Sequence, residues 1–189
     1  LLAAALLFYM DPGDLIPLAA LAAGFHELGH WTAVRLMGGE VRVLRLTVTG
    51  GNMELDHRRP LTYGGELAAI LAGPGVNLLL ALLCARLGGE REALYALSGL
   101  SLALGWFNLL PIYPLDGGRA LLLILSAFTT PGRARQAVWG CSVILVALLL
   151  AAGMSLLWRG GRNLTLPGMA LWLLCGLTRR EEGRTPVKK

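Results

Sequence analysis

Charged and aromatic residues are scarce in this 189-residue sequence, at 15% and 7%. Hydrophobic residues make up 55%, and the mean hydropathy is +0.60. A soluble domain of this length covers its surface with charged side chains, and a disordered chain has few hydrophobic residues. The composition therefore argues against both classes and predicts one membrane-embedded domain.

Cysteine is scarce as well, and its three positions, Cys84, Cys141 and Cys175, stand far apart in apolar segments. They form no CxxC pair, and their number is odd. The pattern therefore supports neither a disulfide framework nor a thiolate metal site, and the cysteines are expected to be small core residues.

Basic residues outnumber acidic residues by 17 to 12, which gives a net charge of +5. They lie between and after long apolar runs rather than on one face, so they indicate the flanks of membrane spans and no nucleic-acid partner. Lys and Arg gather at 42–59, at 133–135 and at the chain end. This distribution predicts that these three regions lie on the cytoplasmic side of the lipid bilayer.

Long apolar runs predict an all-α polytopic membrane protein with about six transmembrane helices. The opening run has neither the basic segment nor the cleavage site of a signal peptide, so the first span is instead expected to be partial, the end of a helix whose start is missing. The fourth is too long for one span and contains Pro111 and Pro114, which predict a break. The predicted spans are 1–9, 15–37, 65–87, 94–129, 137–158 and 163–178. Together they form a single domain at 1–178, followed by a short charged cytoplasmic tail at 179–189.

Alternating residues between the second and third spans predict a small membrane-associated β-hairpin. Apolar residues alternate with Arg and Thr over 41–49, and the turn-forming sequence Gly-Gly-Asn follows at 50–52. An exposed edge strand can hold an unwound peptide by β-augmentation, so Val43, Leu46 and Val48 are expected to bind substrate. The alternative is a short amphipathic hairpin that rests at the membrane interface.

The second predicted span contains the sequence His-Glu-Leu-Gly-His at 26–30. Positions i and i+4 of a helix share a face, so His26 and His30 can bind one metal ion with Glu27 beside it. Imidazole nitrogens suit zinc, and Glu27 would take a proton from a zinc-activated water. The alternative is a set of hydrogen bonds inside a helix bundle. Ionisable side chains in a membrane span are costly, which favours a functional site.

A zinc site needs a third ligand, and the other predicted spans offer few carboxylates. Asp116 is the best candidate, because it is expected in the same cytoplasmic half of the bilayer as His30. Gly117 and Gly118, which follow it, leave room for a neighbouring helix or substrate. A helix N-cap is the alternative role for Asp116. His57 is a weaker candidate for a further ligand, because its charged loop is typical of solvated segments.

Three segments, in this order, resemble the site-2 protease family of membrane-embedded zinc metalloproteases, which cut substrates in or near their transmembrane segments. The sequence at 26–30 matches the HExxH motif, and that at 73–77 matches G-P-x-x-N. The sequence at 108–118 matches the highly specific N-x-x-P-x-x-P-L-D-G-G motif.

The resemblance implies a role for each matching residue. Zinc would be held by three ligands: His26, His30 and Asp116. Glu27 would be the catalytic acid and base, and Asn77 and Asn108 would hold substrate or stabilise the oxyanion. From the residues alone, Asn77 has an equally good alternative role in a hydrogen bond between helices.

The expected function is intramembrane zinc endopeptidase activity in regulated proteolysis of single-pass transmembrane or membrane-associated proteins. The active site is expected in the cytoplasmic half of a prokaryotic cell membrane. The chain has no room for the PDZ or CBS domains of many relatives, so it resembles the compact sporulation-type branch, and a separate membrane protein would regulate it. Two alternatives remain: another HExxH membrane zinc protease, of the CAAX or heat-shock type, whose third ligand is usually Glu, and a non-catalytic transporter or scaffold.

Overall fold

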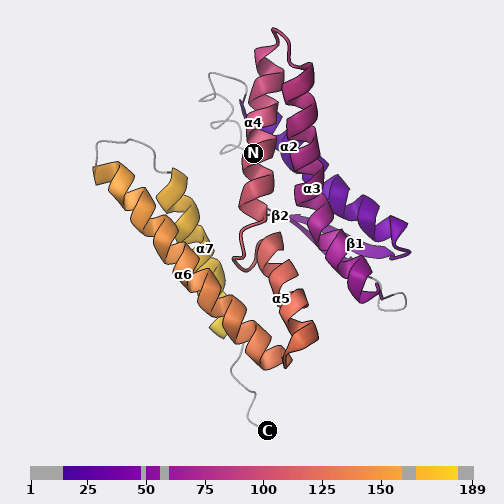
Figure 1. Ribbon diagram of the computed structural model, residues 1–189, viewed down its shortest axis with the longest axis vertical. Helices are drawn as coiled ribbons and strands as arrows, with labels where there is room; N and C mark the ends of the chain where they lie inside the picture. Colours follow the sequence, from indigo (N-terminus) through magenta and orange to yellow (C-terminus); the bar gives the residue numbers. More distant parts are fainter. Residues whose placement is uncertain (1–14, 48–49, 56–59, 159–164, 183–189) are drawn as a thin grey trace. The chain divides into compact units, whose positions relative to one another are not determined.

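The computed structural model describes residues 15–47, 50–55, 60–158 and 165–182 (Figure 1). Within these ranges the chain forms six helices and one two-stranded antiparallel sheet. The chain divides into two compact units, residues 1–109 and 110–189. Each unit is described by itself.

The first unit is built on three helices: α2 (Leu15–Leu36), α3 (Tyr63–Leu87) and α4 (Glu92–Asn108). The helix α3 packs against both α2 and α4, which also contact each other. Each helix contributes one small or aliphatic residue to a shared buried cluster: Ala22, Cys84 and Leu97. The interior of this unit is therefore made where the three helices meet.

Two glycines allow the helix backbones of the first unit to approach closely. A Cβ added at Gly29 would lie 2.8 Å from the carbonyl oxygen of Ala72, and one at Gly105 would lie 3.2 Å from that of Pro74. Small residues at helix crossings permit this kind of contact. As a result, α2 lies directly on α3 next to the turn that contains His30.

Helix α3 has clear chemical signals at both ends. Its N-cap is Thr62, whose Oγ1 accepts a hydrogen bond from the Gly65 backbone N–H at 3.2 Å. Beyond its C-terminal end, Gly89 adopts a φ of 52°, which glycine tolerates without strain. These signals place the start and end of the helix that faces α2.

The sheet lies between α2 and α3 in the sequence. Strand β1 (Val41–Thr47) pairs with β2 (Gly50–Leu55), and Val43 lies opposite Glu54 while Leu46 lies opposite Gly51. The pairing is irregular between Val41 and Val43, as at a β-bulge.

The second unit contains α5 (Asp116–Phe128), α6 (Pro131–Trp158) and α7 (Thr165–Glu182). Helix α6 packs against both α5 and α7. A Cβ added at Gly153 would lie 2.9 Å from Cδ of Pro167, so α6 and α7 are in close contact at that point.

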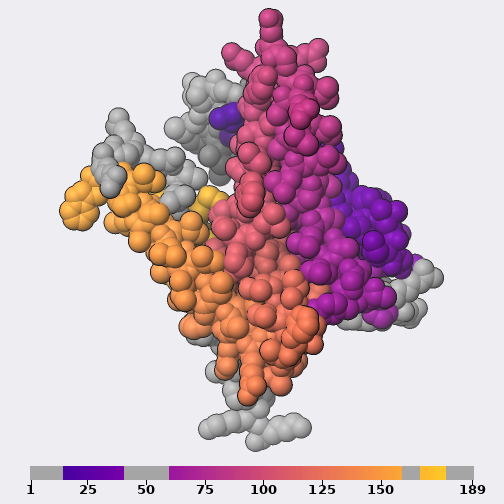
Figure 2. All heavy atoms as spheres, in the orientation of Figure 1, coloured from indigo at the N-terminus to yellow at the C-terminus, as the bar shows by residue number. Residues whose placement is uncertain are grey.

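Large apolar side chains are exposed along α6, drawn in orange in Figure 2. These are Trp139, Ile144, Leu148, Met154, Leu156 and Trp158. Water disfavours a helix of 28 residues with such a surface, whereas lipid tails do not.

The predicted fold class is wrong in its number of spans. Among the described residues, two helices, α3 and α6, are long and apolar enough to cross a membrane. The turn around Pro111 and Pro114 divides the predicted fourth span into α4, with 17 residues, and α5, with 13. An all-α polytopic architecture with about six transmembrane helices is therefore not supported, and neither is membrane association of a β-hairpin. The predicted first span at 1–9 lies outside the described residues.

Candidate metal centre

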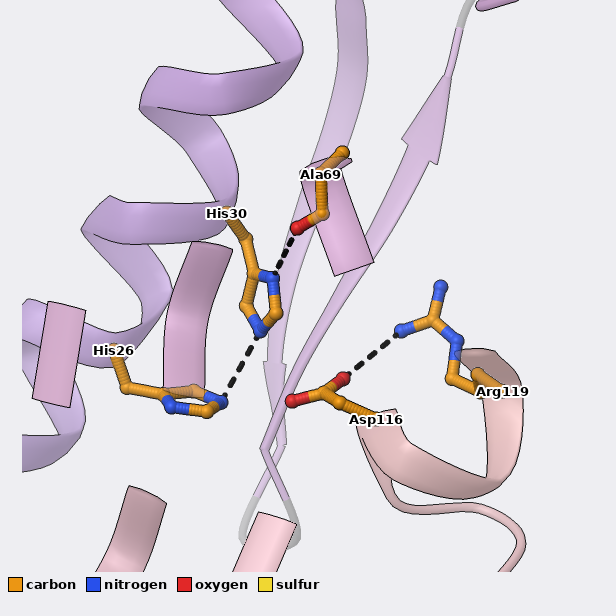
Figure 3. Close-up of polar contacts among 5 residues, drawn as sticks. All are labelled: His26, His30, Ala69, Asp116 and Arg119. Atoms are coloured by element: carbon orange, nitrogen blue, oxygen red, sulfur yellow. Dashed lines mark hydrogen bonds and ion pairs between the residues drawn. The ribbon is translucent and has the colours of Figure 1, made fainter. Parts of the chain in front are cut away.

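Two histidines of α2 point their imidazoles toward each other (Figure 3). The Nε2 atoms of His26 and His30 are 3.1 Å apart, and the two ring planes are nearly perpendicular, at 86°. His26 is buried, and His30 is half-buried. The spacing i, i+4 places both on one helix face, as the sequence predicts.

The tautomer of His30 follows from its contact with α3. Its Nδ1 lies 2.7 Å from the carbonyl oxygen of Ala69 (Figure 3). A carbonyl oxygen can only accept, so Nδ1 is the protonated nitrogen and donates the hydrogen bond. In the neutral ring the lone pair is then on Nε2, the atom that faces His26. Metal-binding histidines are commonly oriented by such a bond to a carbonyl.

The His26 and His30 pair fits zinc by donor type and by distance. Two imidazole nitrogens on one tetrahedral zinc ion, each at about 2.0–2.1 Å from it, are about 3.3 Å apart. The observed separation of 3.1 Å is close to this value.

Gly73 of α3 provides the space for the His30 ring. A Cβ added at Gly73 would overlap Nε2, Cε1 and Cδ2 of His30. Any larger residue would therefore displace the imidazole itself. The sequence motif at 73–77 indicates this glycine, although its contact with His30 was not predicted.

Glu27 follows His26 on α2 and is half-buried. It lies three residues before His30, so the same turn of the helix presents a carboxylate and both imidazoles. This is the arrangement expected of an acid and base beside a metal ion.

Asn77 of α3 is fully buried, and its Nδ2 lies 3.4 Å from Nδ1 of His26. Asn108, the last residue of α4, is half-buried and donates from Nδ2 to the Leu104 carbonyl oxygen at 3.0 Å. Of the two asparagines expected to hold substrate, Asn77 therefore lies against a histidine, and Asn108 lies at a helix end.

In the second unit, Asp116 is the first residue of α5 and is buried, with 6% of its surface exposed. Its Oδ1 lies 3.5 Å from Nη1 of Arg119, whose side chain is half exposed (Figure 3). The N-cap of α5 is Leu115, so the predicted alternative of Asp116 as the N-cap is wrong. A carboxylate in the first turn is stabilised by the partial positive charge of the helix N-terminus.

Ser142 of α6 fixes the turn that precedes Asp116. Its buried Oγ accepts from the backbone N–H of Tyr113 at 2.9 Å and donates to the Val138 carbonyl oxygen at 2.7 Å. On the other side of the turn, a Cβ added at Gly118 would overlap the backbone of Ile112. Sequence reasoning missed Ser142. Its only signal is a small polar residue in a long apolar helix.

The remaining predicted residues are only partly described. Val43 and Leu46 lie in β1, where the structure describes the backbone. Val48 and His57 lie outside the described residues.

Residues 85–151 match peptidase family M50, and this segment contains Asn108, Asp116 and Ser142. A zinc metalloprotease of Methanocaldococcus jannaschii is 35% identical over 108 residues, which are 53% of this chain and 31% of that protein. The stage IV sporulation protein FB of Bacillus subtilis is 31% identical over 105 residues, which are 53% of this chain and 36% of that protein. Rip3 of Mycobacterium tuberculosis is 32% identical over 195 residues, which cover 94% of this chain and 47% of Rip3. The chain thus spans about a third of the first two relatives and about half of Rip3.

A solved structure shares the fold. It is a site-2 protease from Methanocaldococcus jannaschii, with a TM-score of 0.69 and 27% sequence identity. The similarity covers 93% of this chain and 80% of that one.

Proposed function

We propose that this chain, which matches peptidase family M50 over residues 85–151 and shares the fold of a site-2 protease, is an intramembrane zinc endopeptidase that cuts membrane-associated proteins. One observation carries the proposal: the Nε2 atoms of His26 and His30 lie 3.1 Å apart on one face of α2, and Glu27 is the residue next to His26 in the same turn. The names of the relatives support it, since those of the Methanocaldococcus jannaschii protein and of Rip3 both include zinc metalloprotease.

The proposed zinc ligands are His26, His30 and Asp116. The two imidazoles are supported by their distance and by the contact of His30 with Ala69. Asp116 is supported by its burial at a helix N-terminus and by its place in the segment that matches the family. Zinc, when bound, acts as a Lewis acid toward the scissile carbonyl and lowers the pKa of a water molecule.

Glu27 is the proposed acid and base of the hydrolysis. Its carboxylate takes a proton from the attacking water as the water oxygen bonds to the scissile carbonyl carbon. When the C–N bond breaks, Glu27 gives that proton to the leaving amine. Both transfers need a carboxylate that is near the metal ligands and is not itself a ligand.

Asn108 is the proposed substrate contact at the end of α4. An amide nitrogen has two N–H groups, and the bond to Leu104 uses one of them. The second N–H can donate to a substrate carbonyl or to the oxyanion that forms from it. Among the described residues, β1 and β2 pair only with each other, so the outer edge of each strand can offer backbone groups to an unwound substrate segment.

The site-2 protease family is membrane-embedded, and the apolar helices α3 and α6 are consistent with that location. We further propose a multi-pass protein of a prokaryotic cell membrane with its active site in the cytoplasmic half. The clusters of Lys and Arg at 42–59, 133–135 and 179–189 support this orientation. Single-pass transmembrane or membrane-associated proteins are the proposed substrates, and a separate membrane protein is the proposed regulator.

Metal analysis combined with a cleavage assay tests this function. The purified chain in detergent should contain about one zinc per chain and should cut a fluorogenic peptide that carries a transmembrane segment. A chelator should stop cleavage, and added zinc should restore it. A protein without stoichiometric zinc, or cleavage that survives complete removal of the metal, would rule the proposal out.

A further inference from the structure

The surroundings of Asn77 suit a task other than substrate contact. Its side chain has no exposed surface, and its Oδ1 has no hydrogen-bond partner among the described residues. A Cβ added at Gly105 of α4 would lie 3.3 Å from Cβ of Asn77, so the neighbouring helix restricts movement of this side chain. A buried amide oxygen without a partner is costly, and such a group calls for an explanation.

Among the described residues, the Asn77 amide has one hydrogen-bond partner, Nδ1 of His26 at 3.4 Å. The tautomer of His26 therefore depends on which amide group faces it. If Nδ2 faces the ring, Nδ1 accepts, and the proton of the neutral imidazole is on Nε2. If Oδ1 faces the ring, Nδ1–H donates, and the lone pair is on Nε2.

Zinc requires the arrangement in which Oδ1 of Asn77 faces the His26 ring. His26 can bind a metal through Nε2, the atom that faces His30, only when Nε2 carries the lone pair. Rotation of the amide by about 180° exchanges Oδ1 and Nδ2 with almost no change in shape. The same rotation gives Oδ1 a partner and leaves the N–H groups of Nδ2 without one among the described residues, so the lone pair that zinc needs on Nε2, and not the number of hydrogen bonds, favours the rotated amide.

We propose that Asn77 is a positioning residue for the metal: its amide oxygen accepts from Nδ1–H of His26 and so holds Nε2 ready for zinc. This inference rests on the proposed function, because it assumes that His26 binds zinc. It makes Asn77 the counterpart of the Ala69 carbonyl, which holds His30 in the same tautomer. Both partners are on α3, so this one helix orients both imidazoles of α2.

Zinc affinity of Asn77 variants tests the proposal. The full-length chain in detergent is titrated with Zn²⁺ against a fluorescent chelator. Asn77→Leu has a similar volume and no polar atoms, so it should bind zinc about 10–100-fold more weakly. Asn77→Asp keeps an acceptor for Nδ1–H and should retain the parental affinity.

Ser101→Ala is the matched control. Ser101 of α4 is also fully buried, and its Oγ has no hydrogen-bond partner among the described residues. Its removal deletes a buried polar atom of α4 that makes no hydrogen bond to His26, so zinc affinity should stay parental. Equal losses in Ser101→Ala and Asn77→Leu would reduce the role of Asn77 to general packing and overturn the proposal.

A spectroscopic measurement needs no change at Asn77. The chain contains three histidines, so ¹⁵N-labelled imidazoles give a simple NMR spectrum, and His57→Gln identifies the signals of the third ring. In the zinc-loaded protein, Nδ1 of His26 should be protonated and Nε2 metal-bound. Metal bound through Nδ1 would contradict the proposal, even if Asn77→Leu fails to fold.

The outcomes separate this inference from the function on which it rests. If the parent binds no zinc, both fail. If the parent binds zinc and Asn77→Leu binds it equally well, only the role of Asn77 fails. If Asn77→Asp loses as much affinity as Asn77→Leu, an acceptor is not what the site needs, and the inference is again contradicted.

Discussion

The hydroxyl of Ser142 accepts a hydrogen bond from the backbone N–H of Tyr113 at 2.9 Å, three residues before Asp116. The serine is buried in α6, and its hydroxyl donates a hydrogen bond to the Val138 carbonyl oxygen. The Ser142 side chain thus attaches the turn that leads into α5 to the neighbouring helix α6. The position of the Asp116 carboxylate depends on this attachment, because Asp116 begins the helix that follows the turn.

Ser142→Ala should loosen this turn. The change leaves the Tyr113 N–H without its partner, at a cost of about 1–3 kcal/mol of stability. Zinc affinity should fall as well, because the proposed carboxylate ligand, Asp116, is then held less firmly. Thermal unfolding and chelator competition measure the two effects.

Ser155→Ala is the control for that experiment. Ser155 lies on the same helix, is exposed and bonds only to the Ala152 carbonyl of its own helix at 2.8 Å. Its loss should leave the thermal stability and the zinc affinity unchanged. A parental zinc affinity in Ser142→Ala would show that the turn does not hold the ligand.

Gly73→Ala should displace the His30 ring, because the new methyl group would occupy the space of the imidazole. The ring cannot move without losing either the bond to Ala69 or its position beside His26. Zinc affinity should therefore fall at least about tenfold. Gly75→Ala is matched to it, since the space around Gly75 is open, and zinc binding should remain parental. Equal behaviour of the two variants would disprove the steric role of Gly73.

Asp116→Ala should lower zinc content sharply, because two imidazoles alone hold catalytic zinc poorly. Asp116→Asn keeps the volume but removes the charge, and it should bind zinc more weakly than the parent. Metal analysis after dialysis against a weak chelator measures the zinc content of both variants. Full zinc occupancy in Asp116→Ala would mean that another residue is the third ligand.

The proposed orientation predicts which cysteine labels are accessible from each side of the membrane. With the three native cysteines replaced, a cysteine in 50–60 should react from the cytoplasm, and one at position 91 should react from the opposite side. A membrane-impermeant maleimide applied to intact cells and to inverted vesicles distinguishes the two. Labelling of 50–60 in intact cells would overturn the proposed cytoplasmic active site.

Local spacing was sufficient to predict some parts of the site. The i, i+4 spacing placed His26 and His30 on one helix face, and Pro111 with Pro114 predicted the break between α4 and α5. Both features depend on residues that are close in sequence. Contacts between helices join residues that are far apart in sequence. The hydrogen bond between Ser142 and Tyr113 and the space that Gly73 leaves for the His30 ring therefore became visible only in the structure.

The number of spans could not be predicted from apolar runs. Hydropathy does not distinguish a helix that crosses a membrane from a short apolar helix packed against its neighbours. The apolar run at 94–129 contains the two helices α4 and α5, neither of which meets the length for a span. The predicted division into a domain at 1–178 and a tail at 179–189 remains a prediction, and residues 183–189 lie outside the described part of the chain.

The most direct test of the account is the comparison of Glu27→Gln with the parent, with zinc content and cleavage rate measured on the same preparations. The substitution keeps the size of the side chain and removes the proton acceptor, so zinc should remain near parental. Cleavage should fall by about 10²–10⁴. Parental cleavage with zinc bound would contradict the role of Glu27 as acid and base, and loss of zinc would instead make Glu27 part of the metal site.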